Sequence, residues 1–211
     1  MARLYTDATI DPTKLELLQE WAPTRPWFDG TPGAAIEQLA SYRFDDPDGQ
    51  VGLETVLVRA GDGPVLHVPI TFRDAPLEGA ESSLITTMEH SVLGRRWVYD
   101  ATGDPVWVAA LSTAVLTGGI QADQMIGPDD DLRPRDPTAT VAGSGTPGTE
   151  VPAVGSLTSE DTATTTVIAT SALEITLTRV LGDRPVADGS PVLLGSFGDR
   201  EGVLLAVVRP L

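Results

Sequence analysis

The side chains best suited to chemistry lie close together in the segment EHSVLGRRWVYD, residues 89–100. A carboxylate, an imidazole, a guanidinium group and two aromatic rings stand there, in Glu89, His90, Arg95, Trp97 and Tyr99. Such groups can hold a ligand through hydrogen bonds, charge and ring stacking. The sequence therefore predicts a candidate binding cluster at these five residues.

Catalytic and metal-binding motifs are missing around this cluster. The chain has two histidines, His67 and His90, and neither lies in an HxH or HExxH motif or beside paired carboxylates. There is no cysteine, which excludes disulfides, a thiol nucleophile and a thiolate metal ligand. We therefore expect no catalytic residues, no metal and no cofactor.

Two strands, 84–90 and 95–100, are expected to position the cluster. In RRWVYD, the side chains of Arg95, Trp97 and Tyr99 alternate with those of Arg96, Val98 and Asp100. Because neighbouring side chains of a strand point to opposite faces, the two arginines should face opposite sides of the sheet. They are not expected to form one basic patch.

The net charge of the chain limits the kinds of partner that it can bind. Against 14 Lys and Arg stand 30 Asp and Glu, a formal net charge of −16. This charge repels nucleic acid and anionic membranes. The first residues carry charge where a signal peptide needs an apolar core, and no apolar run reaches the ~18 residues of a membrane span. We expect a soluble, cytoplasmic protein that binds neither nucleic acid nor membrane.

A buried helix is predicted directly after the cluster. Asp104 suits the N-cap, Pro105 the first helical position, and Gly118-Gly119 the end. No charged residue lies between these signals, so the helix should be covered on nearly every side. We expect Trp107 to be part of the core; the alternative makes it a surface aromatic that stacks on a sugar or a partner.

The rest of the first half predicts one short helix and a sheet. Asp11 as N-cap and Pro12 at the first helical position predict a helix that ends before Pro23. Alternation and turn signals predict a three-stranded meander over 36–44, 52–60 and 65–72. Within it, Pro69 indicates an edge or a bulge, and His67 is expected on the more polar face, exposed or hydrogen-bonded.

The second half is expected to hold a linker and a smaller β region. Residues 120–161 are rich in Gly, Pro, Thr and Asp, with a short strand over 138–142 and a GSG triplet that lacks the context of a phosphate-binding loop. Four further strands are predicted, over 164–170, 173–181, 191–197 and 203–208. The chain is therefore predicted to be an antiparallel α+β protein in three parts: 1–119, 120–161 and 162–211.

Several motifs in a fixed order resemble a known family. The segments DPTKLELLQEWAPTRPWFDG, SYRFDDPDGQVGLETVLVR, VLHVPITFRDAPL and above all EHSVLGRRWVYDATGDPVWVAALSTAVLTGG are similar to the N-terminal cap domain of actinobacterial maltokinases and related sugar kinases, over about residues 11–119. The resemblance implies a cystatin-like fold, a curved antiparallel sheet against a helix. Those kinases phosphorylate maltose with ATP and Mg²⁺ on a route from trehalose to glycogen.

The sequence departs from a complete kinase of that kind. TATTTVIATSALEITLTRVL is similar to the first strands of a kinase N-lobe, but the resemblance puts Thr176 where a lysine should contact the nucleotide phosphates. An HGD-like catalytic loop and a metal-binding aspartate of a C-lobe were not found in the sequence. We expect a degenerate, pseudokinase-like region and no enzymatic activity.

Three functional hypotheses remain. The first is a non-catalytic cap-like protein with an interaction or regulatory role, whose protein partner is an enzyme of sugar or trehalose–glycogen metabolism. The second is a module that binds a small molecule, a sugar or a nucleotide, on a concave sheet face. The third is an incomplete maltokinase-type phosphotransferase that needs a second chain.

Overall fold

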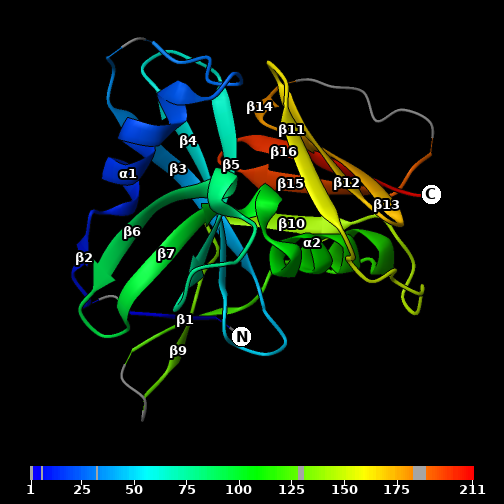
Figure 1. Ribbon diagram of the computed structural model, residues 1–211, viewed down its shortest axis with the longest axis horizontal. Coiled ribbons are helices and arrows are strands. Elements are labelled where there is room, and N and C mark those ends of the chain that lie inside the picture. The colour runs from blue at the N-terminus through cyan, green and yellow to red at the C-terminus, as the bar shows by residue number, and fades with distance from the viewer. Residues whose placement is uncertain (1, 6, 32, 128–130, 183–188) are drawn as a thin grey trace.

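Two large, curled antiparallel sheets and two α-helices form the protein (Figure 1). This computed structural model describes residues 2–5, 7–31, 33–127, 131–182 and 189–211. The first sheet has the strand order β2-β6-β7-β5-β4-β3, with β14 added beside β5; the second has the order β10-β15-β16-β13-β12-β11. A small third sheet has the order β1-β8-β9. The predicted α+β class with mainly antiparallel sheets is confirmed.

The first sheet contains the meander and the two strands of the predicted binding cluster. Its strands are β2 (Ile10–Asp11), β3 (Ile36–Phe44), β4 (Gly52–Ala60), β5 (Val65–Arg73), β6 (Leu84–His90), β7 (Gly94–Asp100) and β14 (Val180–Leu181). The five strands predicted between residues 36 and 100 are confirmed within one residue at each end. Arg95 pairs with Glu89 and Arg96 with Met88, so the two arginines do face opposite sides.

Helix α1 (Lys14–Trp21) begins later than the sequence predicts. The expected N-cap, Asp11, lies in β2, and Thr13 caps the helix instead. The backbone N–H of Glu16 donates to the Thr13 hydroxyl at 3.3 Å, and the N–H of Thr13 donates to the Glu16 carboxylate at 2.8 Å. This reciprocal capping box satisfies two free donors, whereas an aspartate at position 11 could satisfy only one. A short 3-10 helix, Ala22–Thr24, follows α1.

Pro69 lies in β5, an interior strand, but at a local gap in the pairing. On the side of β5 away from β4, β14 pairs with Val65 and Leu66, and β7 pairs from Ile70 onward. The backbone N–H of His67 points to this side, where it donates to the Arg179 carbonyl at 2.8 Å. Pro69, two residues further on, points its nitrogen the same way. The missing N–H of Pro69 therefore faces a position where neither β14 nor β7 pairs with β5. At this residue β5 behaves like the edge strand that the sequence predicted.

His67 is fully buried between the two sheets rather than exposed. Its Nε2 lies 2.8 Å from the Tyr42 hydroxyl and its Nδ1 lies 2.9 Å from the Thr178 carbonyl oxygen, so the hydrogen-bonded alternative is confirmed. Burial lowers the pKa of His67 to about 3. The ring is therefore neutral at physiological pH and serves as a polar contact between the sheets.

Helix α2 (Pro105–Thr117) has the ends that the sequence predicts. The Asp104 side chain accepts from the Val106 N–H at 3.0 Å, and Gly118 ends the helix in the left-handed region with φ of 74°. Asp104 also accepts two bonds from Arg73, both at 2.7 Å, which ties the start of α2 to β5. Thr113 alone in this helix is exposed.

The GSG triplet caps the end of α2. The N–H of Gly145 donates to the Val115 carbonyl at 2.9 Å, and the N–H of Gly143 donates to the Gly119 carbonyl at 2.8 Å. A Cβ on Gly143 would stand 1.9 Å from the Ala114 carbonyl oxygen, so only glycine fits. Since these N–H groups already serve the helix end, they are not free to hold a phosphate.

The second sheet is built from the chain after α2. Its strands are β10 (Ala139–Gly143), β11 (Leu157–Asp161), β12 (Thr165–Thr170), β13 (Leu173–Thr178), β15 (Val192–Phe197) and β16 (Arg200–Pro210). The third sheet joins β1 (Ala2–Leu4), β8 (Gln124–Ile126) and β9 (Arg133–Arg135). Residues 120–161 thus provide both edge strands of the second sheet, and the short strand predicted over 138–142 is confirmed as β10. The division of the chain at 119 and 161 stays a prediction.

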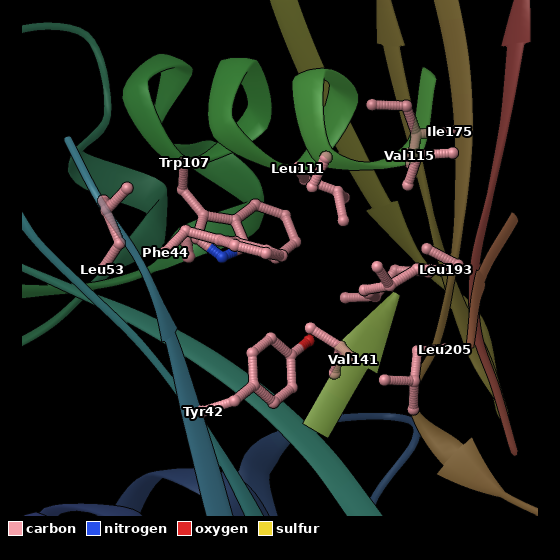
Figure 2. Close-up of a cluster of buried hydrophobic side chains, with 14 of the residues drawn as sticks. Tyr42, Phe44, Leu53, Trp107, Leu111, Val115, Val141, Ile175, Leu193 and Leu205 are labelled. Atoms are coloured by element: carbon pink, nitrogen blue, oxygen red, sulfur yellow. The ribbon is translucent and has the colours of Figure 1, made fainter. Parts of the chain in front are cut away.

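One apolar core joins α2 to both sheets (Figure 2). Figure 2 shows Trp107, Leu111 and Val115 of α2 pointing into the space between the sheets. Phe44 and Leu53 meet them from the first sheet; from the second come Val141, Ile175, Leu193 and Leu205. A separate core lies under α1, where Leu17 and Leu18 pack on the other face of the first sheet. The second sheet is therefore packed on the first rather than tethered to it.

Candidate functional site

A cavity of about 490 Å³ lies among the start of α1, the turn between β3 and β4, and residues of β5, β6, β7 and β9. It is lined by Tyr5, Ile10, Lys14, Arg43, Phe44, Asp45, Asp46, Gly49, Gln50, Val51, Gly52, Leu53, Glu54, Phe72, Met88, His90, Leu93, Arg96 and Arg135. This volume falls within the ~300–1,000 Å³ of small-molecule sites. The cavity is therefore large enough for a small-molecule ligand.

Glu54 is a buried carboxylate at the floor of this cavity. Its side chain is 3% exposed, accepts from Lys14 Nζ at 2.6 Å and forms an ion pair with Arg43. Burial raises the pKa of Glu54, but the cations of Arg43 and Lys14 more than offset this and lower it to about 2. Glu54 therefore stays ionised at physiological pH and is fully engaged by two cations of the site.

Two other cations of the cavity lack a carboxylate partner. The Nη2 of Arg96 donates to the Leu93 carbonyl at 2.7 Å, whereas its Nε is buried with no acceptor in the part of the chain that the structure describes. Arg135, from β9, is exposed at the rim and makes no ion pair to any described residue. Because the Nε is buried, Arg96 can offer a ligand its Nη1, and Arg135 can offer its whole guanidinium group.

His90 lines the same cavity, and its hydrogen bonds show which ring nitrogen carries the proton. Its Nδ1 accepts the N–H groups of Val92 and Leu93 at 3.2 and 3.1 Å. Burial and the charge of Arg96 lower the pKa of His90. The neutral ring therefore carries its proton on Nε2, where it is a hydrogen-bond donor. The ring of Tyr5 contacts the histidine edge to face, with centroids 5.6 Å apart.

The structure divides the five residues of the predicted cluster between two faces of the β6–β7 hairpin. Of the five, only His90 lines the cavity. Glu89 and Arg95 form an exposed ion pair of 2.8 Å on the opposite face, and Trp97 lies half-buried on that face. Tyr99 is buried, and its hydroxyl accepts from the Leu77 N–H at 2.8 Å. Its role in this structure is to hold the Leu77 backbone.

The cavity cations were missed by sequence reasoning because they come from four separate elements. Lys14 lies in α1, Arg43 in β3, Arg96 in β7 and Arg135 in β9. No short motif connects such positions, and only the pairing of β3 with β4, of β4 with β5 and of β5 with β7 brings Arg43 and Arg96 into one sheet. The alternation in RRWVYD was the usable signal, because it separates Arg96 from Arg95.

A second polar cluster lies between the two sheets at Arg179, whose side chain is fully buried. Its Nη2 donates to Asp100 Oδ2 at 2.5 Å, and its Nε donates to the Thr166 hydroxyl at 2.7 Å. The guanidinium group also lies over the Trp27 ring, 4.8 Å from its centroid. Because Asp100 ends β7 and Thr166 belongs to β12, this arginine connects the first sheet to the second.

Asp161 of β11 extends this cluster. It accepts from Arg25 Nη2 at 2.5 Å and from the Thr166 hydroxyl at 2.5 Å. Burial raises the pKa of Asp161, but Arg179, Thr166 and Arg25 together lower it below its ordinary value. Among the described residues, the side chain of Asp161 contacts Arg25, Thr166 and Arg179, which belong to other elements, as is typical of a structural ion pair.

The chain is an α+β protein with a cavity of a volume suited to a small molecule. Residues 21–104 match the family model of the maltokinase N-terminal cap domain. The resemblance stated from the sequence is confirmed for this segment, which runs from the last residue of α1 to the N-cap of α2. No curated protein was found to match the chain. Neither described helix is long and apolar enough to cross a membrane.

Proposed function

We propose that this protein is a non-catalytic, maltokinase-cap-type module that acts by binding a protein partner. The match of residues 21–104 to the maltokinase N-terminal cap domain is the observation that carries the proposal. The cap is proposed to be cystatin-like, and the second sheet to be a degenerate, pseudokinase-like N-lobe. Because the family belongs to sugar kinases, we propose that the partner is an enzyme of sugar or trehalose–glycogen metabolism. We also propose that the protein is cytoplasmic.

The buried carboxylates support the non-catalytic part of the proposal. Glu54, Asp100, Asp104 and Asp161 each form an ion pair with lysine or arginine. Phosphoryl transfer needs carboxylates that hold metal and substrate, and these four are already engaged between elements. Thr176, at the position of the expected lysine, lies in β13 between Val167 and Val207 of the neighbouring strands. Threonine is uncharged, so Thr176 cannot replace the lysine that would contact the nucleotide phosphates.

The β6–β7 hairpin is the surface that we propose for the partner. At its tip, Val92 is 59% exposed and Leu93 40% exposed. The exposed ion pair of Glu89 and Arg95 and the half-buried Trp97 lie beside it. Apolar and aromatic side chains bordered by charged groups are the usual composition of a protein interface.

A matched pair of variants tests this surface in a pull-down from the native host. Glu89→Ala with Arg95→Ala removes the hairpin ion pair, and Asp131→Ala with Arg133→Ala removes an equally exposed ion pair near β9. We expect wild type and the Asp131/Arg133 variant to retain the same sugar-metabolism enzyme and the Glu89/Arg95 variant to retain less of it. Retention of that enzyme by none of the three, or equally by all, would contradict the proposal.

A second candidate function, a small-molecule-binding module, is favoured by the cavity itself. The cavity has a ligand-like volume and combines an apolar wall, which includes Phe72 and Met88, with the polar groups of His90 and Arg96. The two functions can coexist in one chain, because the cavity and the Glu89/Arg95 pair lie on opposite faces of the hairpin, and of the hairpin residues named for the partner surface only Leu93 also lines the cavity.

A further inference from the structure

We propose that the 490 Å³ cavity binds a small organic anion, whose phosphate or carboxylate group is held by Arg96 and Arg135. The proposal rests on the second candidate function, small-molecule binding, and names the chemical class of the ligand. It is carried by the charge of the lining, by the unpaired donors and by the apolar wall.

The lining concentrates positive charge in an acidic protein. The whole chain has a formal net charge of −16, yet four of its 14 basic residues, Lys14, Arg43, Arg96 and Arg135, line this cavity. The acidic residues of the lining are Asp45, Asp46 and Glu54. Counted together, the four cations and three carboxylates leave the cavity one unit positive. The local positive charge of the lining favours an anion over a neutral ligand of the same shape.

Two of these carboxylates are already engaged within the protein. Glu54 accepts from Lys14 and Arg43. Asp46 accepts the backbone N–H groups of residues 48, 50 and 51 at 2.9 to 3.1 Å, and so holds the β3–β4 turn. Arg96 and Arg135, in contrast, have no carboxylate partner within the described ranges. Arg96 and Arg135 are therefore the two cations of the lining that an anionic ligand can pair with.

The available hydrogen-bonding groups are mainly donors. In Arg96, Nη2 donates to the Leu93 carbonyl and Nε is buried, so Nη1 is the nitrogen that can donate to a ligand. Arg135 offers a whole guanidinium group at the rim, and the neutral His90 offers its Nε2–H. A ligand that satisfies these groups must bring acceptors. Phosphate and carboxylate oxygens bind guanidinium groups in the strongest, charge-assisted geometry.

The apolar part of the lining indicates an organic molecule rather than a bare inorganic ion. Seven apolar residues belong to the lining: Ile10, Phe44, Val51, Leu53, Phe72, Met88 and Leu93. The side chains of Phe44, Val51 and Leu53 belong to the core between the sheets, so Ile10, Phe72, Met88 and Leu93 are the apolar side chains left for a ligand. A free phosphate ion would fill only a small part of 490 Å³ and would gain nothing from these side chains. An anion with a carbon framework of several atoms can contact both the cations and the apolar side chains of the cavity.

Four probes and four variants test the inference by isothermal titration calorimetry. Glucose, glucuronate and glucose 6-phosphate share a sugar ring but differ in charge, and inorganic phosphate lacks the ring. Arg96→Gln and Arg135→Gln each remove one cation of the cavity. The matched controls are Arg95→Gln, one position away on the opposite face, and Arg133→Gln, on the same short strand but outside the lining.

We expect saturable binding of glucuronate or glucose 6-phosphate, weaker binding of inorganic phosphate, and none of glucose. Arg96→Gln and Arg135→Gln should each weaken binding ~10- to 100-fold, the usual effect of losing a charge-assisted hydrogen bond, while the two controls change it less than ~3-fold. The measured preference between glucuronate and glucose 6-phosphate distinguishes carboxylate from phosphate.

Three outcomes would overturn the inference. Absence of saturable binding for both charged sugars removes the ligand class together with the small-molecule candidate, but leaves the protein-partner function untouched. Equal binding of glucose and its charged analogues keeps a small-molecule site and rejects the anion. If Arg95→Gln and Arg133→Gln weaken binding as much as Arg96→Gln and Arg135→Gln do, the anion is attracted by the charge of the whole surface and does not bind in the cavity.

Discussion

Trp107→Ala should lower the free energy of unfolding by about 3–5 kcal/mol, a large part of the ~5–15 kcal/mol of a typical domain. The Trp107 side chain is fully buried, and Figure 2 shows it between α2 and the first-sheet residues Phe44 and Leu53. Removal of its ring leaves a cavity in the one core that both sheets share. Chemical denaturation followed by circular dichroism measures the loss.

Two substitutions in the same helix complete this experiment. Leu111→Ala, also in the shared core, should cost ~2–5 kcal/mol, whereas Thr113→Ala, on the exposed side, should change stability by less than ~0.5 kcal/mol. Trp107 Nε1 has no hydrogen-bond partner among the described residues, so Trp107→Phe should restore part of the loss through packing alone. A Trp107→Ala variant as stable as Thr113→Ala would show that Trp107 belongs to a binding surface.

Arg179→Met should destabilise the protein by about 3–5 kcal/mol, because it leaves a carboxylate buried without its cation. Asp100 is 5% exposed, and Arg179 is its ion-pair partner across the two sheets. Methionine keeps most of the apolar stem and removes the charge, so the measured loss is mainly electrostatic. The free energy of unfolding from urea titration gives the value.

The control for Arg179 is an exposed ion pair. Arg95→Met breaks the contact with Glu89, whose side chains are 62% and 60% exposed, and should cost at most ~1 kcal/mol because water solvates both groups. A double variant, Arg179→Met with Asp100→Leu, should recover part of the stability, since it leaves no unpaired charge at Asp100. A loss for Arg179→Met as small as that for Arg95→Met would mean that Arg179 does not connect the sheets.

The sequence predicted the elements whose signals are local. Asp104, Pro105 and Gly118 define both ends of α2, and the period-2 alternation locates the strands between residues 36 and 100. The N-cap of α1 was assigned to the wrong residue because Asp-Pro also starts a helix in many sequences, and the reciprocal bonds of Thr13 and Glu16 decide between the two.

Features that depend on distant residues could not be predicted. His67 was expected on a polar face, and only the packing of β13 on that face buries it. Arg179 gains its partners from residues 77 to 79 positions earlier in the chain, Asp100 and Thr102. The cavity has the same origin, because its cations are far apart in the sequence and meet through strand pairing. Local patterns therefore give the elements, and tertiary contacts give the site.

The absence of catalysis is the claim on which the proposed function depends most. Purified protein should be incubated with ATP, Mg²⁺ and each of maltose, glucose and trehalose, with heat-denatured protein as the background control. We predict no sugar phosphate and no ADP above that background, because Glu54, Asp100, Asp104 and Asp161 are engaged in ion pairs and Thr176 brings no cation to the expected lysine position. Formation of sugar phosphate in proportion to protein concentration, by material that keeps this activity through two different purifications, would contradict the account.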